Sequence, residues 1–291
     1  MKHRSGHAVA FVFVLGLSSA SASTSINAVN YQAYGANIGW LNARGDVANG
    51  AVIGQFYSWG HIWGANVGWI SLGSGTPTNG WQYSNAAAGD WGVNHDGVGN
   101  LRGMAYGANI GWINFEDTGD PRVNLLTGNL SGYAYGANVG WISLSNSQAF
   151  VQTDFLDPGP DSDGDGIPDA WEMMIAGDLT TLGPYPDDAD GDGYPDIFEY
   201  WADTDPMDDT SFLAITDIER ENSTNAVTWT VQPTRLYRLE EAQSVTNNAP
   251  WVDTGFGLIE PGAGPTLSQD VVQTNDMPRF YRTRAVVPLA P

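Results

Sequence analysis

Cysteine is absent from the 291 residues, and histidine occurs only four times. Without cysteine the chain has neither disulfide bonds nor thiolate chemistry, so its stability must come from core packing or from bound metal. Positive charge is also scarce, with 11 Lys and Arg residues against 33 Asp and Glu residues. The formal net charge of −22 excludes an electrostatic nucleic-acid binder and argues against binding to an anionic membrane surface.

Long apolar runs are missing except at the N-terminus, where residues 8–17 are apolar. A basic stretch precedes this run, and Ala-Ser-Ala at residues 20–22 follows it as a small-residue cleavage site. This order of a basic stretch, an apolar run and a small-residue site predicts a secretory signal peptide over residues 1–22. Cleavage is expected after Ala22, and the mature protein is therefore expected to be extracellular. A buried N-terminal helix is the alternative. No later segment is apolar enough for a membrane helix, so membrane insertion is not expected.

Groups that carry out catalysis are few. Only His61 and His95 remain after signal removal, and no nucleophile-elbow, zinc-protease or phosphate-loop motif occurs. Glu116, Asp117 and Asp120 offer a carboxylate pair for glycoside hydrolysis. The surrounding FEDTGDPR, however, is typical of a polar loop between hairpins, and we expect no enzyme activity.

Aromatic residues and glycine, by contrast, are abundant and form a repeat within residues 23–153. AYGANIGW, WGANVGW, AYGANIGW and AYGANVGW begin at positions 33, 63, 105 and 134. Apolar and aromatic residues alternate with Gly and polar residues, and Gly-Ala-Asn reverses the chain because Gly and Asn tolerate positive φ. Each copy therefore predicts a β-hairpin, and the repeat period predicts an array of stacked hairpins.

Two roles remain open for the tryptophans of this region. Trp at strict repeat spacing is more often core, and both faces of the return strand VGWISL are apolar, so both are expected to be covered. The tryptophans predicted as core are Trp40, Trp69, Trp112 and Trp141. The less regular ones, which are better candidates for exposed contacts with sugar rings, are Trp59, Trp81 and Trp91.

The acidic residues are concentrated in residues 154–209, which hold 18 Asp or Glu residues and no Lys or Arg. In this segment DSDGDGIPDAWE begins at Asp161, and DADGDGYPDIFE begins at Asp188. Both stretches place Asp at loop positions 1, 3, 5 and 9, Gly at position 6 and Glu at position 12. This is the ligand spacing of an EF-hand-type calcium loop.

The spacing predicts two Ca²⁺ ions, one in each loop. Alternate Asp residues turn inward, position 7 supplies its backbone carbonyl, and the Glu at position 12 reaches back with both oxygens. The predicted ligands of the first ion are Asp161, Asp163, Asp165, Ile167, Asp169 and Glu172. Those of the second ion are Asp188, Asp190, Asp192, Tyr194, Asp196 and Glu199. A solvated acidic linker is the alternative, and two full matches with Gly in register count against it.

Proline at position 8 of both loops departs from a conventional EF-hand. Pro168 and Pro195 have no N–H for the short backbone bridge that usually joins paired loops. The Pro/Gly-rich QTDFLDPGP predicts no helix before the first loop, whereas AWEMMIA and IFEYWA predict outgoing helices of one or two turns. The main core candidates of the segment are Trp171, Met174, Ile175, Phe198 and Trp201.

The segment over residues 154–212 resembles the type-3 thrombospondin-like calcium repeats of large secreted bacterial proteins, in which DxDGDGxPDxWE is followed by DxDGDGxxDxxEYxxGTDP. Here Ala202-Asp203 replaces the usual Ala-Gly. The resemblance implies that the Asp of the trailing TDP helps complete a site, so Asp205 is a weaker ligand candidate and Asp203 a weaker one still. The domain that follows, ending RFYRTRAV, resembles the C-terminal module that accompanies such repeats. YGANIGW is similar to aromatic repeats of bacterial surface proteins that have no assigned activity.

Residues 210–291 alternate like strands in AVTWTV, RLYRLEEA and RFYRTRAV, which predicts a small β-sandwich. This segment holds six of the 11 basic residues, and we expect it to be the electrostatic partner of the acidic segment.

The sequence as a whole predicts a mainly β protein in four parts. These are a signal peptide (1–22), a β-repeat domain (23–153), tandem calcium loops (154–209) and a C-terminal β-sandwich (210–291). We expect a secreted, non-enzymatic, calcium-binding protein that is a structural or adhesive component of the cell surface. The alternative is a lectin-like protein that binds carbohydrate through its repeat aromatics. The expected partners are cell-surface polymers or glycans.

Overall fold

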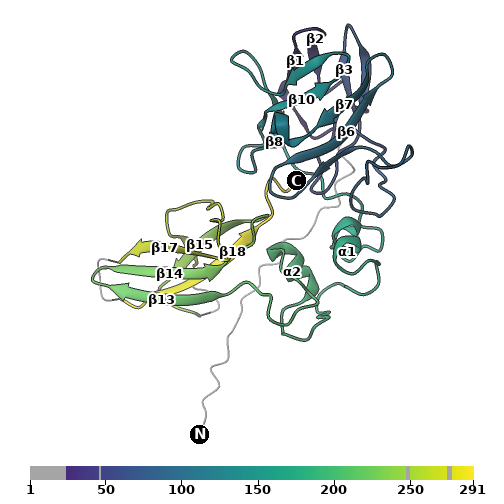
Figure 1. The fold of residues 1–291 in the computed structure, drawn as a ribbon. Helices are drawn as coiled ribbons and strands as arrows, with labels where there is room; N and C mark the ends of the chain where they lie inside the picture. Colours follow the sequence, from purple (N-terminus) through teal and green to yellow (C-terminus); the bar gives the residue numbers. More distant parts are fainter. Residues whose placement is uncertain (1–23, 46, 247–249, 274–276) are drawn as a thin grey trace.

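The computed structural model describes residues 24–45, 47–246, 250–273 and 277–291, and the predicted signal peptide lies outside them. The fold is mainly β, as predicted, with antiparallel sheets and two short α-helices. A barrel, a helical connector and a pair of small sheets follow one another along the chain (Figure 1). No helix in the described part of the chain is long and apolar enough to cross a membrane.

Four hairpins, each carrying one copy of the aromatic repeat, form an eight-stranded barrel. The hairpins are β1–β2 (Ile26–Gly35, Gly39–Asn42), β3–β4 (His61–Gly64, Gly68–Ser71), β6–β7 (Leu101–Gly107, Gly111–Phe115) and β10–β11 (Tyr133–Gly136, Gly140–Ser143). Successive hairpins pair side by side, and β11 pairs with β1 to close the ring. The repeats therefore close on themselves instead of stacking in a line, which removes the exposed edge strands of an open sheet.

Short strands extend the barrel at the ends of β1 and β6 that lie away from the hairpin turns. β5 (Val93–His95) pairs with β6, and β12 (Val151–Thr153) pairs with β1. A small hairpin, β8 (Arg122–Val123) and β9 (Leu130–Ser131), follows the 3₁₀ turn η1 (Asp117–Gly119).

Each hairpin turn lies at the predicted Gly-Ala-Asn, but the residue with positive φ is the glycine that follows the turn. In the first hairpin the Ile38 N–H donates to the Gly35 carbonyl at 3.1 Å, and Gly39 follows with a φ of 80°. The glycines after the other three turns, Gly68, Gly111 and Gly140, also have positive φ. Among the described residues Asn37 is not one of those with positive φ, so the expectation that Asn supplies this conformation is wrong.

The repeated tryptophans lie outside the barrel, and the prediction that they are core residues is wrong. Trp40, Trp69, Trp112 and Trp141 are 42–47% exposed. Residues of the same repeats that point inward form the core: Ala33, Ile38, Leu41, Val67, Ile70, Ala105, Ile110, Ile113, Ala134, Val139 and Ile142.

The glycine after each turn explains this error. A regular strand would place Val139 and Trp141 on one face. Because Gly140 has a φ of 77°, Val139 and Ile142 both reach the interior and Trp141 remains outside. The expectation that both faces of the return strand are covered is therefore wrong. The three tryptophans predicted as exposed are half-buried: Trp59, Trp81 and Trp91.

The repeat asparagines link the four turns into a ring. Each Asn side-chain amide donates to the carbonyl of the preceding hairpin's turn: Asn66 to Ile38, Asn109 to Val67, Asn138 to Ile110 and Asn37 to Val139, at 2.9–3.1 Å. The last bond joins the first hairpin to the fourth, so the ring closes with the barrel.

We predict that Asn109→Ala lowers the free energy of unfolding by about 1 kcal/mol, because it removes one net hydrogen bond of this ring. Chemical denaturation followed by tryptophan fluorescence measures the change. Gln148→Ala, at an exposed loop position of the same domain, is the control and should stay within about 0.5 kcal/mol of the wild type. Equal stability of the two variants would show that the ring contributes nothing.

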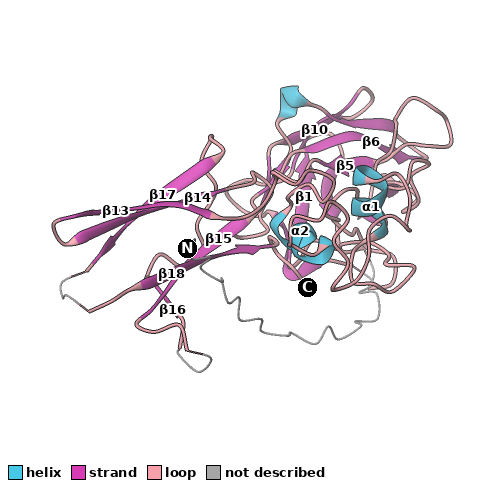
Figure 2. Cartoon of the chain, turned by 90° about the horizontal axis from the view of Figure 1, so that it is seen from below, coloured by secondary structure: helices cyan, strands magenta, loops and turns pink. Residues whose placement is uncertain are grey.

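Two short helices form the connector, as predicted: α1 (Asp169–Ile175) and α2 (Asp196–Ala202). Each begins directly after the proline of its loop, where a missing N–H costs nothing because the first N–H groups of a helix have no partner in it. Both helices lie below the barrel in the view of Figure 1 and in front of it in Figure 2, which is seen from below. Their core consists of Ile167, Trp171, Leu182 and Tyr200, packed against Phe56 of the barrel domain.

Met174 and Trp201 are 36% and 45% exposed, so their prediction as core residues of the connector is wrong. In their place Leu182 and Tyr200 complete the cluster around Trp171. Tyr200 is in addition anchored to the barrel domain, since its hydroxyl donates to Gln55 Oε1 at 3.2 Å.

The C-terminal domain consists of two three-stranded sheets around one core. One sheet has the order β13-β14-β17 and the other β16-β15-β18. The strands are β13 (Ile215–Glu221), β14 (Thr224–Thr230), β15 (Leu236–Ala242), β16 (Val252–Asp253), β17 (Thr266–Val272) and β18 (Phe280–Val286). The residues after β18 return to the barrel, where the carbonyl of Leu289 accepts from the Leu156 N–H at 2.9 Å.

Candidate metal centre

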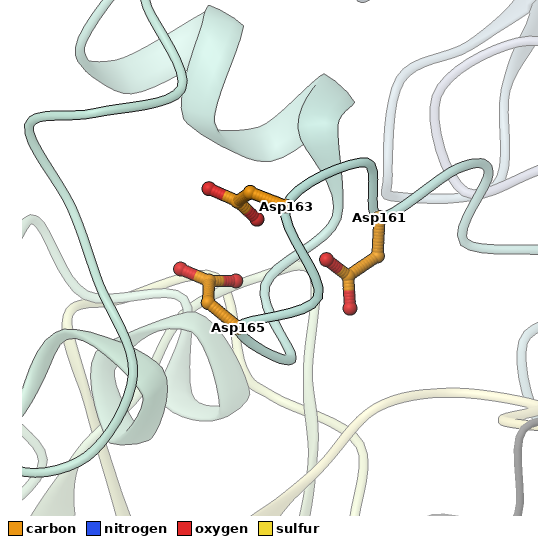
Figure 3. A group of neighbouring side chains, drawn as sticks. All are labelled: Asp161, Asp163 and Asp165. Atoms are coloured by element: carbon orange, nitrogen blue, oxygen red, sulfur yellow. The ribbon is translucent and has the colours of Figure 1, made fainter.

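The two acidic loops bring their first three aspartates together. One carboxylate oxygen from each of Asp161, Asp163 and Asp165 lies within 4.8 Å of the others, and Figure 3 shows these groups facing a common space. The same limit holds for the second set, Asp188, Asp190 and Asp192. Ionised carboxylates at this separation repel one another, and a cation between them would offset that repulsion.

Backbone N–H groups fix the first aspartate of each loop. Asp161 accepts from the N–H groups of Gly164 and Gly166 at 2.8 and 3.1 Å. Asp188 accepts from the equivalent Gly191 and Gly193 at 2.8 and 3.0 Å. The two loops thus share one conformation.

The glycine at position 6 makes the predicted sharp bend. Gly166 and Gly193 have φ values of 97° and 99°. A side chain at either position would be strained, because L-residues rarely adopt this conformation. The requirement for Gly is therefore a property of the backbone.

The glutamate at position 12 of each loop is buried and has carboxylate oxygens without hydrogen-bond partners. Glu172 is fully buried, and neither of its carboxylate oxygens has a hydrogen-bond partner. Glu199 is 1% exposed, its Oε1 accepts from the Thr204 hydroxyl at 3.1 Å, and its Oε2 has no partner. A buried carboxylate without a donor is costly, so these oxygens fit ligands of a cation.

Burial and crowding change the proton affinity of these acids. The pKa of Glu172 is raised to about 8, first by burial and then by the carboxylates of Asp165 and Asp163. Burial likewise raises the pKa of Glu199 to about 8, against the opposing hydrogen bond from Thr204. A cation at the loop would oppose these shifts, because it favours the ionised form.

Further unpartnered oxygens belong to the same loops. They are Asp165 Oδ2, Asp190 Oδ2 and Asp192 Oδ2, all buried. The other oxygens of Asp165 and Asp192 accept from the N–H groups of Ile167 and Tyr194, both at 2.7 Å. The carboxylates are therefore oriented by the backbone on one side and left without partners on the other.

The aspartate at position 9 has hydrogen bonds to both oxygens in each loop. Asp169 accepts from the backbone N–H and the hydroxyl of Ser162 at 2.6 and 2.5 Å. Asp196 accepts from the N–H groups of Ala189 and Gly183 at 2.9 and 3.0 Å. This geometry ties the start of each helix to the second loop residue. Direct metal ligation by Asp169 and Asp196 stays a prediction, as does ligation by the carbonyls of Ile167 and Tyr194.

The two weaker ligand candidates make contacts elsewhere. Asp203, with a φ of 56°, ends α2 and accepts from Trp171 Nε1 at 2.9 Å and from the hydroxyl of Thr234. Its Oδ1 also lies 3.5 Å from Arg235 Nη2. Asp205 is exposed and accepts from the Met207 N–H at 3.0 Å. These contacts give Asp203 a role in joining the connector to the C-terminal domain.

Electrostatic pairing between the acidic segment and the C-terminal arginines runs through Arg235, which also donates to the carbonyls of Tyr200 and Trp201 at 2.6 and 3.0 Å. Arg238, Arg279, Arg282 and Arg284 pair instead with acids of their own domain. Reasoning from the sequence missed Arg235 and the hydrogen bond from Thr204. The Thr of the trailing TDP was the available signal for the latter.

Comparison with known proteins gives no further assignment. No family model matches the chain, and neither the curated proteins nor the solved structures include a match. The resemblance of residues 154–212 to thrombospondin-like repeats therefore stays a prediction that rests on the motifs.

Proposed function

We propose that the chain is a secreted, non-enzymatic calcium-binding protein, a structural or adhesive component of the cell surface whose connector is stiffened by two Ca²⁺ ions. The observation that carries this proposal is the pair of buried glutamates, Glu172 and Glu199, whose carboxylates retain unpartnered oxygens. Every candidate ligand atom in the loops is a hard oxygen, which suits Ca²⁺, Mg²⁺ or Mn²⁺. Flexible loops with many carboxylates and a glutamate that can bind through both oxygens favour Ca²⁺ among them.

Contacts on either side of the connector support the stiffening role. Trp171 of α1 donates to Asp203 at the end of α2, and Arg235 of the C-terminal domain donates to the last carbonyls of α2. On the other side, Tyr200 reaches Gln55 of the barrel domain. An ion that fixes the two loops fixes the starts of α1 and α2, and through them the position of one domain relative to the other.

Two of the catalytic candidates, His95 and Asp120, make contacts within the protein. Both ring nitrogens of buried His95 are engaged, Nδ1 with the carbonyl of Gln55 at 3.0 Å and Nε2 with the Gly99 N–H at 3.1 Å. Asp120 pairs with Arg122 at 2.9 Å on the surface. These groups are satisfied by the protein itself.

We predict that Glu172→Gln weakens calcium binding in the first loop more than tenfold and leaves the second loop unchanged, with Glu199→Gln giving the reverse. Each substitution removes one charge and a two-oxygen ligand. The expected dissociation constants of the wild type are on the order of 10⁻⁴–10⁻³ M, as in extracellular modules. Titration calorimetry on metal-free protein measures both sites.

Glu260→Gln is the control for this experiment, because it makes the same charge change at an exposed position outside the connector. It should retain both sites. A wild-type protein that gives no calcium heat and contains no bound metal by elemental analysis would remove the proposal. Loss of both sites in each single variant would contradict two separate ions.

We predict that the mature protein begins at Ser23, because cleavage after Ala22 follows from the small-residue site. The intact mass of protein recovered from cells with working export checks this. A mass that includes residues 1–22 would contradict the extracellular assignment and leave the calcium sites unaffected.

A lectin-like role is the second candidate, and the outer aromatic rings favour it. The four hairpins expose a ring pair each: Tyr34–Trp40, Trp63–Trp69, Tyr106–Trp112 and Tyr135–Trp141, with centroids 4.8–4.9 Å apart. Exposed rings of this kind offer apolar faces to a partner such as a cell-surface glycan.

A further inference from the structure

On the outer face of the barrel a further ring flanks the pair of several hairpins: His61 lies 6.0 Å from Trp69, Trp91 lies 5.2 Å from Trp112, and the fourth hairpin carries a third ring on its own first strand. Two residues before the first ring of each pair, the other hairpins carry Gln32, His61 and Met104, and the fourth carries Tyr133. Tyr133 is 49% exposed, and its ring meets Trp141 edge-on at 6.2 Å. Tyr135 contacts Trp141 at 4.9 Å, so three exposed rings gather at one place.

A cleft of about 210 Å³ lies against these three rings. Its other wall comes from Asn114 of β7, from Glu116, and from Thr118 and Gly119 of η1. Gly119 is required there, because a Cβ at this position would lie 1.9 Å from the Tyr133 carbonyl oxygen and 3.1 Å from Trp141 Cζ3. The backbone of η1 can therefore approach the rings closely, and this approach shapes the cleft.

The polar groups of the cleft mostly accept hydrogen bonds. Asn114 Oδ1 is buried and has no hydrogen-bond partner, and the Glu116 carboxylate is exposed beside it in the lining. A carboxylate and an amide oxygen accept and do not donate. Among the described residues, no Lys, Arg or His lines this cleft. A ligand that fits must bring donors, present an apolar face to the rings and carry no negative charge.

We propose that this cleft binds one neutral pyranose ring of a glycan. The C–H face of the sugar packs on Trp141 or Tyr135, and its hydroxyl groups donate to Asn114 Oδ1 and Glu116. The volume is below the range of about 300–1,000 Å³ of larger ligand pockets, which suits a single ring. Glu116 disfavours acidic sugars by repulsion. This site rests on the lectin-like candidate above and gives it a location and a class of ligand.

The test uses the full chain with saturating calcium and three neutral probes, the methyl glycosides of glucose, galactose and mannose. Saturation-transfer NMR and tryptophan fluorescence report binding. We expect saturable binding of at least one probe, weakened more than tenfold by Trp141→Ala and by Asn114→Ala. Trp40→Ala is the matched control, since it removes a similarly exposed ring from the hairpin that carries Gln32 at the position of Tyr133, and it should leave binding unchanged.

Three outcomes would overturn the site. They are no binding of any probe, an equal loss in Trp40→Ala, and binding of tetramethylammonium or glucuronate in preference to the neutral sugars. Calcium binding by the same samples, measured separately, shows whether the metal proposal stands when the sugar proposal fails. Because Trp141 is exposed, its replacement keeps the test valid if Asn114→Ala does not fold.

Discussion

Chelation of divalent ions is expected to open the connector to hydrogen exchange while the barrel stays protected. At calcium concentrations a hundredfold above the dissociation constant, each ion stabilises the folded connector by about 2.7 kcal/mol. Removal of calcium should therefore lower amide protection over residues 161–202 by roughly 100-fold or more. The buried cluster of the connector is small, with Ile167, Trp171, Leu182 and Tyr200 as its large side chains, which is little to offset the backbone entropy.

The barrel has a core of its own, formed by inward-facing residues of all four hairpins and closed by the pairing of β11 with β1. Hydrogen exchange read by mass spectrometry, with and without chelator, compares the two regions in one experiment. The double variant Glu172→Gln/Glu199→Gln is the control, and calcium should no longer protect its connector. Equal opening of barrel and connector would contradict their independence. No opening of either would mean that calcium is peripheral to the fold.

Chelation should also loosen the link between the barrel and the C-terminal sheets. Arg235 donates to carbonyls at the end of α2, which fray when the helix opens. We therefore expect the amides that flank Arg235 to lose protection with the connector, while Val227 and Trp229 in the centre of the C-terminal core keep theirs.

The loops were predictable because their ligand spacing is local. Every position from Asp161 to Glu172 lies within one short stretch, and the backbone requirement for Gly166 can be read from the motif. The contacts of Asp169 were not predictable, because the same carboxylate satisfies the spacing whether it faces a proposed ion or the Ser162 N–H. The motif identifies which residue stands at position 9 and does not determine its rotamer.

The barrel was predictable as hairpins but not as a closed ring. Closure depends on the pairing of Gly35 with Ile142, which lie far apart in the sequence, and no local pattern reports it. The exposure of Trp141 escaped prediction for a related reason. Its position follows from the φ of Gly140, and the alternation rule assumes regular strand geometry on both sides of such a glycine.

Calcium should reverse the direction in which stability of the connector depends on pH. In the unfolded chain Glu172 and Glu199 titrate near 4.5, whereas in the folded metal-free protein the pKa of each is raised to about 8. Between these values the folded state holds more protons than the unfolded state. Stability of the metal-free connector is therefore highest below about pH 4.5 and falls as pH rises towards 8.

With calcium the sign changes, because the ion binds the ionised carboxylates and protons compete with it at low pH. Stabilisation of the connector by calcium should be small near pH 5 and should grow towards pH 8. Hydrogen exchange of residues 161–202 at several pH values, corrected for the intrinsic exchange rate and run with chelator or saturating calcium, measures both slopes.

His95 gives the barrel a pH dependence of stability opposite to that of the metal-free connector. The measurement must therefore report on the barrel and the connector separately. Burial lowers the pKa of His95, and the unfolded barrel gains protons as pH falls through about 6.5, which destabilises the barrel in acid. In the double variant Glu172→Gln/Glu199→Gln the pH slope of the metal-free connector should largely disappear, while that of the barrel remains. A slope that survives these substitutions would mean that the remaining loop carboxylates, and not the buried glutamates, control the response.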